Sequence, residues 1–167
     1  MPSLSPLQKI RTSTVDGVHL PRIHRKLILC SKAGSKMLSG RDVANITVAG
    51  PSTVQFLKHH PSAYRAYVIA GDTHAITYRH FKDVFERASS LLHKALNNGY
   101  WVALSCYAGI NRSVTSSLMY VIRYTNKDWR EMRDYIRQQN KIVRRLPALS
   151  NTTFERYLER YAQEHRR

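Results

Sequence analysis

One short stretch of the chain combines a nucleophile with groups that bind an anion. Its central residues are Cys106, Tyr107, Ala108, Gly109, Ile110, Asn111, Arg112 and Ser113. An apolar run precedes the stretch and an apolar helical pattern follows it. Successive backbone N–H groups of a loop that ends at a helix N-terminus converge on one point and bind an anion. Gly109 permits the backbone conformation that such a loop needs. The pattern therefore predicts an oxyanion-binding loop at residues 107–112.

The side chains of this stretch predict reaction at a phosphate. Arg112 supplies a planar fork that matches two oxygens of a phosphate group. The positive field of the loop favours the thiolate form of Cys106, and Ser113 is expected to donate a hydrogen bond to that sulfur. A nucleophile beneath a phosphate-binding loop implies attack at phosphorus and a cysteinyl-phosphate intermediate. Cys106, Arg112 and Ser113 are therefore the predicted catalytic residues of the stretch.

The segments around the loop predict an α/β domain. Four apolar runs indicate buried strands, at Lys26–Cys30, Ala44–Ala49, Ala66–Ala70 and Tyr100–Ser105. The spacing of apolar residues predicts helices at 81–96 and 113–124, and two more that open at Asp128 and Asn151. Because strands alternate with helices, the expected architecture has three layers around a mostly parallel sheet.

The sequence Cys-x5-Arg-Ser between a strand and a helix resembles the signature loop of the cysteine-dependent protein tyrosine phosphatases. The surrounding pattern resembles the compact dual-specificity branch, viral or cellular, from about Lys26 to Tyr161. This resemblance implies the phosphatase fold and a protein phosphatase with no cofactor and no metal. It also implies a general acid on a loop that precedes the long helix before the nucleophile strand. Asp72 matches that position, whereas Asp83 falls within the helical pattern and is expected to face solvent.

By the same resemblance, Asp72 protonates the leaving oxygen and then activates the water that cleaves the phosphoenzyme. The implied substrates are phosphotyrosine and phosphoserine or phosphothreonine on proteins, because the chain is too short for the extra loops that deepen the pocket of tyrosine-only relatives. A shallow, permissive site is expected.

Two alternatives remain open at this point. The family usually has His before the catalytic cysteine, and this chain has Ser105. Since that histidine helps to organise the loop, its replacement leaves open a catalytically weak protein that binds phosphoproteins. The second alternative is an RNA 5′-triphosphatase of the same superfamily, since Gly109-Ile-Asn-Arg112 matches part of the loop of such enzymes. In those enzymes the arginine is commonly followed by Thr-Gly, whereas Ser113-Val114 follows it here.

The charge of the chain predicts anionic partners. Its 167 residues include 27 Lys and Arg against 11 Asp and Glu, a net charge of +16. Such a charge attracts nucleic acid, anionic membranes or phosphorylated substrates. The excess lies in residues 1–71 and 123–167, outside the nearly neutral segment that holds the predicted site. We expect a phosphorylated protein as substrate, with RNA or another polyanion as a further partner.

The remaining expectations concern organisation and location. Residues 1–25 are expected to form a basic N-terminal arm, which could pack on a second copy of the chain, and residues 26–167 the catalytic domain. Met1–Arg11 lacks an apolar core of signal-peptide length, and no stretch is apolar enough to span a bilayer. An intracellular protein, cytoplasmic or nuclear, is therefore expected. Cys30 is predicted to lie in the core. Arg144 and Arg145 are expected to be exposed without a specific role, with binding of phosphate-rich partners as the alternative.

Overall fold

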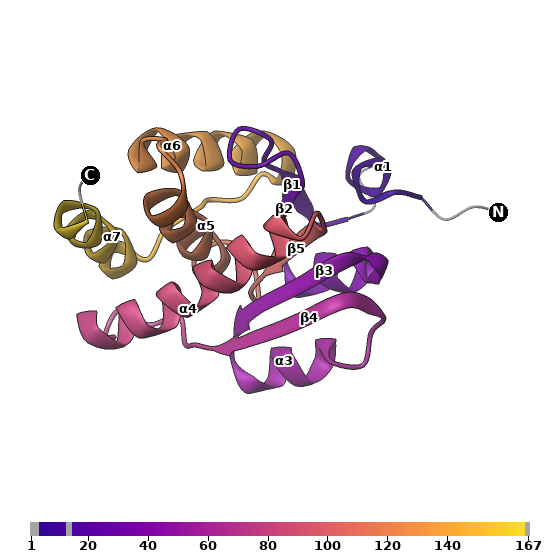
Figure 1. Cartoon of the computed structure of the whole chain (residues 1–167), viewed down its shortest axis with the longest axis horizontal. Coiled ribbons are helices and arrows are strands. Elements are labelled where there is room, and N and C mark those ends of the chain that lie inside the picture. Colours follow the sequence, from indigo (N-terminus) through magenta and orange to yellow (C-terminus); the bar gives the residue numbers. More distant parts are fainter. Residues whose placement is uncertain (1–3, 13–14, 166–167) are drawn as a thin grey trace.

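A five-stranded sheet forms the centre of the computed structural model, which describes residues 4–12 and 15–165. In spatial order the strands are β1 (Gly17–His19), β2 (Leu27–Cys30), β5 (Trp101–Ser105), β3 (Gly40–Ala49) and β4 (Ser62–Ile69) (Figure 1). β1 runs antiparallel to β2, and the other neighbouring pairs are parallel. The mostly parallel sheet predicted from the sequence is confirmed, and all four predicted strands belong to it.

The four predicted helices are also present. They are α4 (Tyr78–Asn97), α5 (Arg112–Tyr124), α6 (Trp129–Gln139) and α7 (Thr152–Glu164). Asp128 caps α6 by accepting hydrogen bonds from the backbone N–H groups of Arg130 and Glu131. Asn151 caps α7 through the N–H of Phe154. The cap residues therefore fix where these helices begin, as the sequence predicts.

Besides the edge strand β1, four further elements are short and were not predicted. They are the helices α1 (Pro6–Arg11), α2 (Lys32–Leu38) and α3 (Pro51–Leu57), and a π-helical turn, η1 (Asn140–Arg144), that continues α6. Each is too short to show a clear apolar period in the sequence. None of the described helices has the length and apolarity that a bilayer span needs.

The two faces of the sheet bury different cores. The larger core lies under α4, α5 and α7, where Phe85 packs 4.9 Å from Phe81 and 5.2 Å from Phe154 between ring centres. A smaller core on the other side gathers Ile28 and Cys30 of β2 with Leu38 of α2 and three other residues, Val15, Val43 and Ala103. Because successive strand residues point to opposite faces, the strands β2, β3 and β5 contribute to both cores, and the three-layer architecture follows.

Part of the segment expected to be an N-terminal arm packs on this domain. Residues 1–3 and 13–14 of that segment, like 166–167 at the other end, lie outside the described residues. Residues 17–19 form the edge strand β1, and Ile10 of α1 packs against the smaller core. Asp16 lies beside α2 so closely that a Cβ on Gly34 would meet its carbonyl oxygen at 2.3 Å. The segment around Asp16 is thus held against the sheet.

Candidate active site

The predicted reactive stretch lies at the carboxyl edge of the sheet, between the end of β5 and the start of α5. We call residues 106–112 the anion loop. β5 pairs with β2 on one side and β3 on the other, so the start of the loop is fixed by two neighbouring strands. The carboxyl edge of a parallel sheet is where α/β folds commonly bind ligands. Cys106 opens the loop and is only 1% exposed.

Two hydrogen-bonding groups point at the sulfur of Cys106. The backbone N–H of Gly109 donates to Cys106 Sγ at 3.2 Å. The hydroxyl of Ser113, in the first turn of α5, lies 3.3 Å from the same sulfur. The structure thus brings Gly109 and Ser113 together around the sulfur of Cys106.

Gly109 occupies a position that no other residue can fill without strain. Its φ is +70°, in the left-handed region that glycine adopts readily. A Cβ at this residue would lie 2.8 Å from Nη1 of Arg144 and 2.8 Å from the backbone carbonyl of Cys30. The tight turn that points the Gly109 N–H at the sulfur therefore requires glycine, which has no Cβ.

Arg112 has a donor that the protein itself leaves unused. Its Nη1 donates to the carbonyl oxygen of Ala70 at 2.8 Å, which ties the arginine to the segment after β4. Its Nε is buried and has no hydrogen-bond partner among the described residues. The N-cap of α5, Asn111, also makes no side-chain bond to the first turn of the helix. Because unpaired buried donors are costly, the site is suited to an anion that pairs with them.

Asp72 is fixed beside the anion loop by two asparagines. Its Oδ2 accepts a hydrogen bond from Asn111 Nδ2 at 2.8 Å, and its Oδ1 accepts one from Asn151 Nδ2 at 2.8 Å. Asn111 Oδ1 in turn accepts from the backbone N–H of Asn151 at 2.9 Å. These contacts join the loop after β4, the anion loop and the start of α7. Asp83 lies elsewhere, on the exposed surface of α4, where it pairs with Arg87.

The expectation that Arg144 is exposed and has no specific role is wrong. Its side chain is only 2% exposed and lies behind the anion loop. Nη2 donates to the carbonyl oxygen of Ala108 at 2.7 Å and Nη1 to that of Gly109 at 2.9 Å. Because these two carbonyls are held by Arg144, the loop presents N–H groups on its other side. Arg145, in contrast, is exposed.

Asp16 completes the support of Arg144. Arg144 Nε donates to Asp16 Oδ1 at 2.8 Å. Burial alone would raise the pKa of Asp16, but hydrogen bonds from Arg144 and Ser31 and the charge of Arg144 bring it below its ordinary value. The pair is therefore ionic at neutral pH. Arg144 is 35 positions after Gly109 in the sequence and 128 after Asp16. The spacing of residues in the sequence therefore gives no indication of either contact.

Two further residues next to the loop, Cys30 and Ser105, are buried in the sheet and belong to its structure. Cys30 is fully buried, as predicted, and burial raises the pKa of its thiol well above the ordinary value, so it stays protonated. Ser105, immediately before Cys106, is also fully buried, and its hydroxyl lies 3.2 Å from that of Thr47 on β3. Ser105 is thus tied to the sheet rather than to the anion loop.

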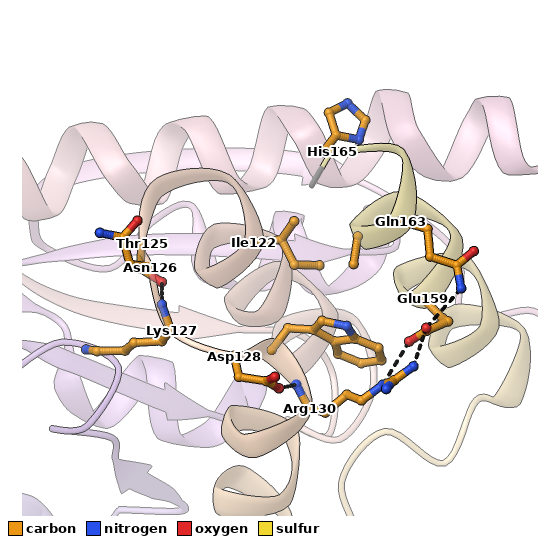
Figure 2. A pocket seen from close by; sticks show the side chains of 11 residues that line it. Ile122, Thr125, Asn126, Lys127, Asp128, Arg130, Glu159, Gln163 and His165 are labelled. Atoms are coloured by element: carbon orange, nitrogen blue, oxygen red, sulfur yellow. Dashed lines mark hydrogen bonds and ion pairs between the residues drawn. The ribbon is translucent and has the colours of Figure 1, made fainter. Parts of the chain in front are cut away.

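A hollow in the surface lies away from the anion loop, between the α5–α6 connection and α7 (Figure 2). Glu159 in its wall is engaged by Arg130, whose Nε lies 3.0 Å from Oε2, and by Gln163 at 3.1 Å. Asp128, also in the wall, caps α6. Since both carboxylates are occupied by structural contacts, the hollow offers no reactive group comparable to Cys106. The described residues also contain no cluster of three or more His, Cys, Asp or Glu that could hold a metal.

Comparisons with known proteins agree with this geometry. A family model described as the catalytic domain of dual-specificity phosphatases matches residues 27–163. The fold is similar to the crystal structure of human DUSP28, with a TM-score of 0.65, 20% identity, and coverage of 89% of this chain and 94% of that one.

Two other solved structures show the same fold. A human tyrosine phosphatase-like serine/threonine/tyrosine-interacting protein matches with a TM-score of 0.62 and 17% identity, over 89% of this chain and 95% of that one. The OH1 protein of Orf virus, described as a tyrosine phosphatase with triple substrate specificity, matches with a TM-score of 0.58 and 18% identity, over 84% of each chain. A search of curated protein sequences gave no significant match.

Proposed function

The chain belongs to the dual-specificity phosphatase family, and we propose that it hydrolyses phosphomonoesters on proteins through a cysteinyl-phosphate intermediate. Residues 26–167 form the catalytic domain in this proposal, with Cys106 as nucleophile, Asp72 as general acid and base, and Arg112 and the amides of residues 107–112 as the phosphate site. The hydroxyl of Ser113 donates a hydrogen bond to the sulfur of Cys106. One observation carries the proposal: the same short loop holds a buried thiol with two hydrogen-bonding groups on its sulfur and an arginine with an unpaired buried donor.

In the first step, the phosphoryl group of the substrate binds in the anion loop. The backbone N–H groups and the unpaired Nε of Arg112 are the donors that suit its oxygens. The thiolate of Cys106 attacks phosphorus, so that an S–P bond forms and the P–O bond to the leaving group breaks. Asp72, in its acid form, gives its proton to the leaving oxygen. The products are the free hydroxyl of the substrate and phosphorylated Cys106.

In the second step, Asp72 acts as the base. Its carboxylate takes a proton from a water molecule, whose oxygen attacks phosphorus and displaces the sulfur. Inorganic phosphate leaves, Cys106 returns as a thiolate, and Asp72 is again protonated. Ser113 and the N–H of Gly109, each within 3.3 Å of the sulfur, stabilise the negative charge that returns to it. Atoms and protons balance over the two steps, with water as the only co-reactant.

The rim of the site supports substrates of more than one kind. Tyr107, the residue after the nucleophile, is 62% exposed, and Ile69, at the end of β4, is 53% exposed. The segment from Ala70 to Thr77 joins β4 directly to α4 without a further element. Since Tyr107 and Ile69 are exposed and the described elements place nothing between β4 and α4, the site suits phosphotyrosine and phosphoserine or phosphothreonine alike.

The test compares wild type with Cys106→Ser on three substrate classes. These are an aryl phosphate, phosphopeptides that carry tyrosine, serine or threonine phosphate, and RNA with a 5′-triphosphate. We expect turnover on the aryl phosphate and on the phosphopeptides that disappears in Cys106→Ser. Preferential release of phosphate from the RNA would show instead that the protein is an RNA 5′-triphosphatase of the same superfamily. Tight phosphopeptide binding without cysteine-dependent turnover would instead indicate a protein that binds phosphoproteins, and it would refute the proposal that the chain is an enzyme.

A further inference from the structure

A row of lysines and aromatic rings at the surface begins at the anion loop and crosses the neighbouring short helices; Lys36 is exposed and Lys32 half-buried. We call it the lysine–aromatic strip. It comprises Tyr107 of the loop, Lys32 and Lys36 of α2, and Phe56 of α3. Tyr107 is 62% and Phe56 39% exposed. Both are large apolar side chains that face solvent beside the predicted site, where exposed apolar groups often mark interaction surfaces.

The rings and the ammonium groups of the strip alternate. Lys32 Nζ lies 4.2 Å from the ring centre of Phe56 and 5.8 Å from that of Tyr107. Lys36 Nζ lies 5.7 Å from the ring centre of Phe56. Cation–π contacts of this kind restrain flexible lysine side chains. The two charges are thus held in place rather than left to sample many rotamers.

Acidic groups do not neutralise the strip. The sequences of α2 and α3 contain neither Asp nor Glu. Within the described ranges, Lys32 and Lys36 form no ion pair with a carboxylate. The strip therefore presents two ordered positive charges, with the Phe56 ring between them, to a bound partner.

The strip is continuous with the predicted site through the backbone as well. The N–H of Lys32 donates to the carbonyl oxygen of Tyr107 at 3.0 Å. The first residue of α2 is thereby fixed against the second residue of the anion loop. A chain that extends from a phosphorylated side chain bound at Cys106 would meet Tyr107 first and the lysines next.

We propose that the lysine–aromatic strip is a docking surface for acidic residues that flank the phosphorylated residue of a protein substrate. This inference rests on the proposed function for the placement of the phosphorylated residue. Carboxylates of the substrate pair with Lys32 and Lys36, and its apolar atoms pack on Phe56 and Tyr107. The strip then selects acidic phosphopeptides over neutral ones, while the anion loop provides the affinity for phosphate.

The arrangement of the strip favours an acidic peptide over single-stranded nucleic acid. Nucleic-acid platforms offer aromatic faces on which bases stack. Here the face of Phe56 is approached by two ammonium groups and that of Tyr107 by one. The charges thus occupy ring surface that a base would need, and they are better placed to receive carboxylates.

The test measures binding of phosphotyrosine peptides to the Cys106→Ser protein by fluorescence anisotropy. One peptide has aspartates on both sides of the phosphotyrosine, and its partner has asparagines at the same positions. We expect the acidic peptide to bind about five- to tenfold more tightly at low salt, the sum expected for two exposed ion pairs. The preference should shrink at high salt because exposed charges are screened.

Substitutions of the two lysines test whether the preference for the acidic peptide arises from the lysine–aromatic strip. Adding Lys32→Gln and Lys36→Gln together should abolish the preference and leave the affinity for the neutral peptide unchanged. Lys94→Gln is the matched control, because this exposed lysine lies near the end of α4, at the opposite edge of the sheet from the anion loop. Equal affinities for the two peptides, or a preference that survives the double substitution, would overturn the proposal.

Two more measurements separate this inference from the proposed function. Hydrolysis of a small aryl phosphate by the Lys32→Gln, Lys36→Gln protein should match wild type, because that substrate does not reach the strip. If turnover never depends on Cys106, the proposed function fails while the peptide preference can still be measured. If single-stranded RNA displaces the acidic peptide at a lower concentration than an equally charged peptide does, the strip is a nucleic-acid surface and the acidic-peptide proposal is wrong.

Discussion

Asn111 Nδ2 donates a 2.8 Å hydrogen bond to Asp72 Oδ2 and thereby joins the anion loop to the loop of the predicted general acid. Asn111 is itself a member of the anion loop, one residue before Arg112. The position of the acid is therefore coupled to the groups that would hold the phosphate. Asn151 makes the matching contact to Asp72 Oδ1, so both carboxylate oxygens have a defined partner.

Replacement of Asp72 should slow turnover without weakening substrate binding. Alanine is the better substitution, because an asparagine would turn its NH₂ group toward an NH₂ donor of Asn111 or Asn151. We expect kcat on phosphotyrosine peptides to fall about 10²- to 10⁴-fold, the range for loss of a general acid. KM should change little because the anion loop is intact. Steady-state kinetics of Asp72→Ala check this, with Asp83→Ala on α4 as the control that should behave as wild type.

Asn111→Ala should affect the acid rather than the nucleophile. Without the Asn111 amide, Asp72 loses the contact that fixes it beside the phosphate site, and a small misplacement of a catalytic group is costly. We expect about a tenfold loss of kcat on substrates with poor leaving groups and little loss on aryl phosphates that need no proton. Ser150→Ala is the control, since Ser150 also contacts Asn111 but not Asp72. Equal losses on both kinds of substrate would show that Asn111 only supports the fold.

Gly109→Ala should destroy the anion loop. The methyl group would lie 2.8 Å from Arg144 and from the Cys30 carbonyl, and the residue would also adopt a positive φ. We expect at least a 100-fold loss of kcat/KM and a loss of about 1–3 kcal/mol in the free energy of unfolding. Gly99→Ala has the same kind of backbone strain at φ +82° but open space around the Cβ. That control should lose stability and keep its activity.

The ion pair of Asp16 and Arg144 should make stability depend on pH. The pKa of Asp16 is lower in the folded protein than in the unfolded chain, so its contribution is present above about pH 4 and is lost as the pH falls through the folded value. Because solvent partly screens the half-exposed carboxylate of Asp16, Asp16→Asn should lower Tm by about 1–2 °C near pH 6, as expected for a loss of roughly 0.5 kcal/mol. Thermal unfolding from pH 6 to 3 should show the two proteins converge. A constant difference across this range would contradict the ion pair.

The elements nearest the site were the easiest to predict from the sequence. Tyr100–Ser105 is a continuous apolar run, and the helix after the loop repeats its apolar residues at helical spacing, so strand, loop and helix all fall where expected. Local signals also placed the caps Asp128 and Asn151. These features depend on contacts within a few residues, which a sequence displays directly.

The long-range contacts that hold Asp72 and the anion loop in place could not be predicted from such local signals. Asn151 was expected only as a helix cap, and it also binds Asp72, which lies 79 residues away. Arg144 resembles any exposed arginine in the sequence, and only the π-helical turn after α6 and the packing of Asp16 bring it under the anion loop. Contacts of this kind arise from tertiary packing and leave no periodic signal.

The central claim is that Cys106 attacks phosphorus, and trapping of the phosphoenzyme tests it most directly. Asp72→Ala is mixed with an aryl phosphate that has a good leaving group, quenched in acid and analysed by mass spectrometry with peptide mapping. Loss of the base slows cleavage of the S–P bond, so we expect one phosphoryl group on Cys106 and none in Cys106→Ser. Continued turnover in Cys106→Ser, or turnover by the intact protein with phosphate never found on Cys106, would contradict the mechanism.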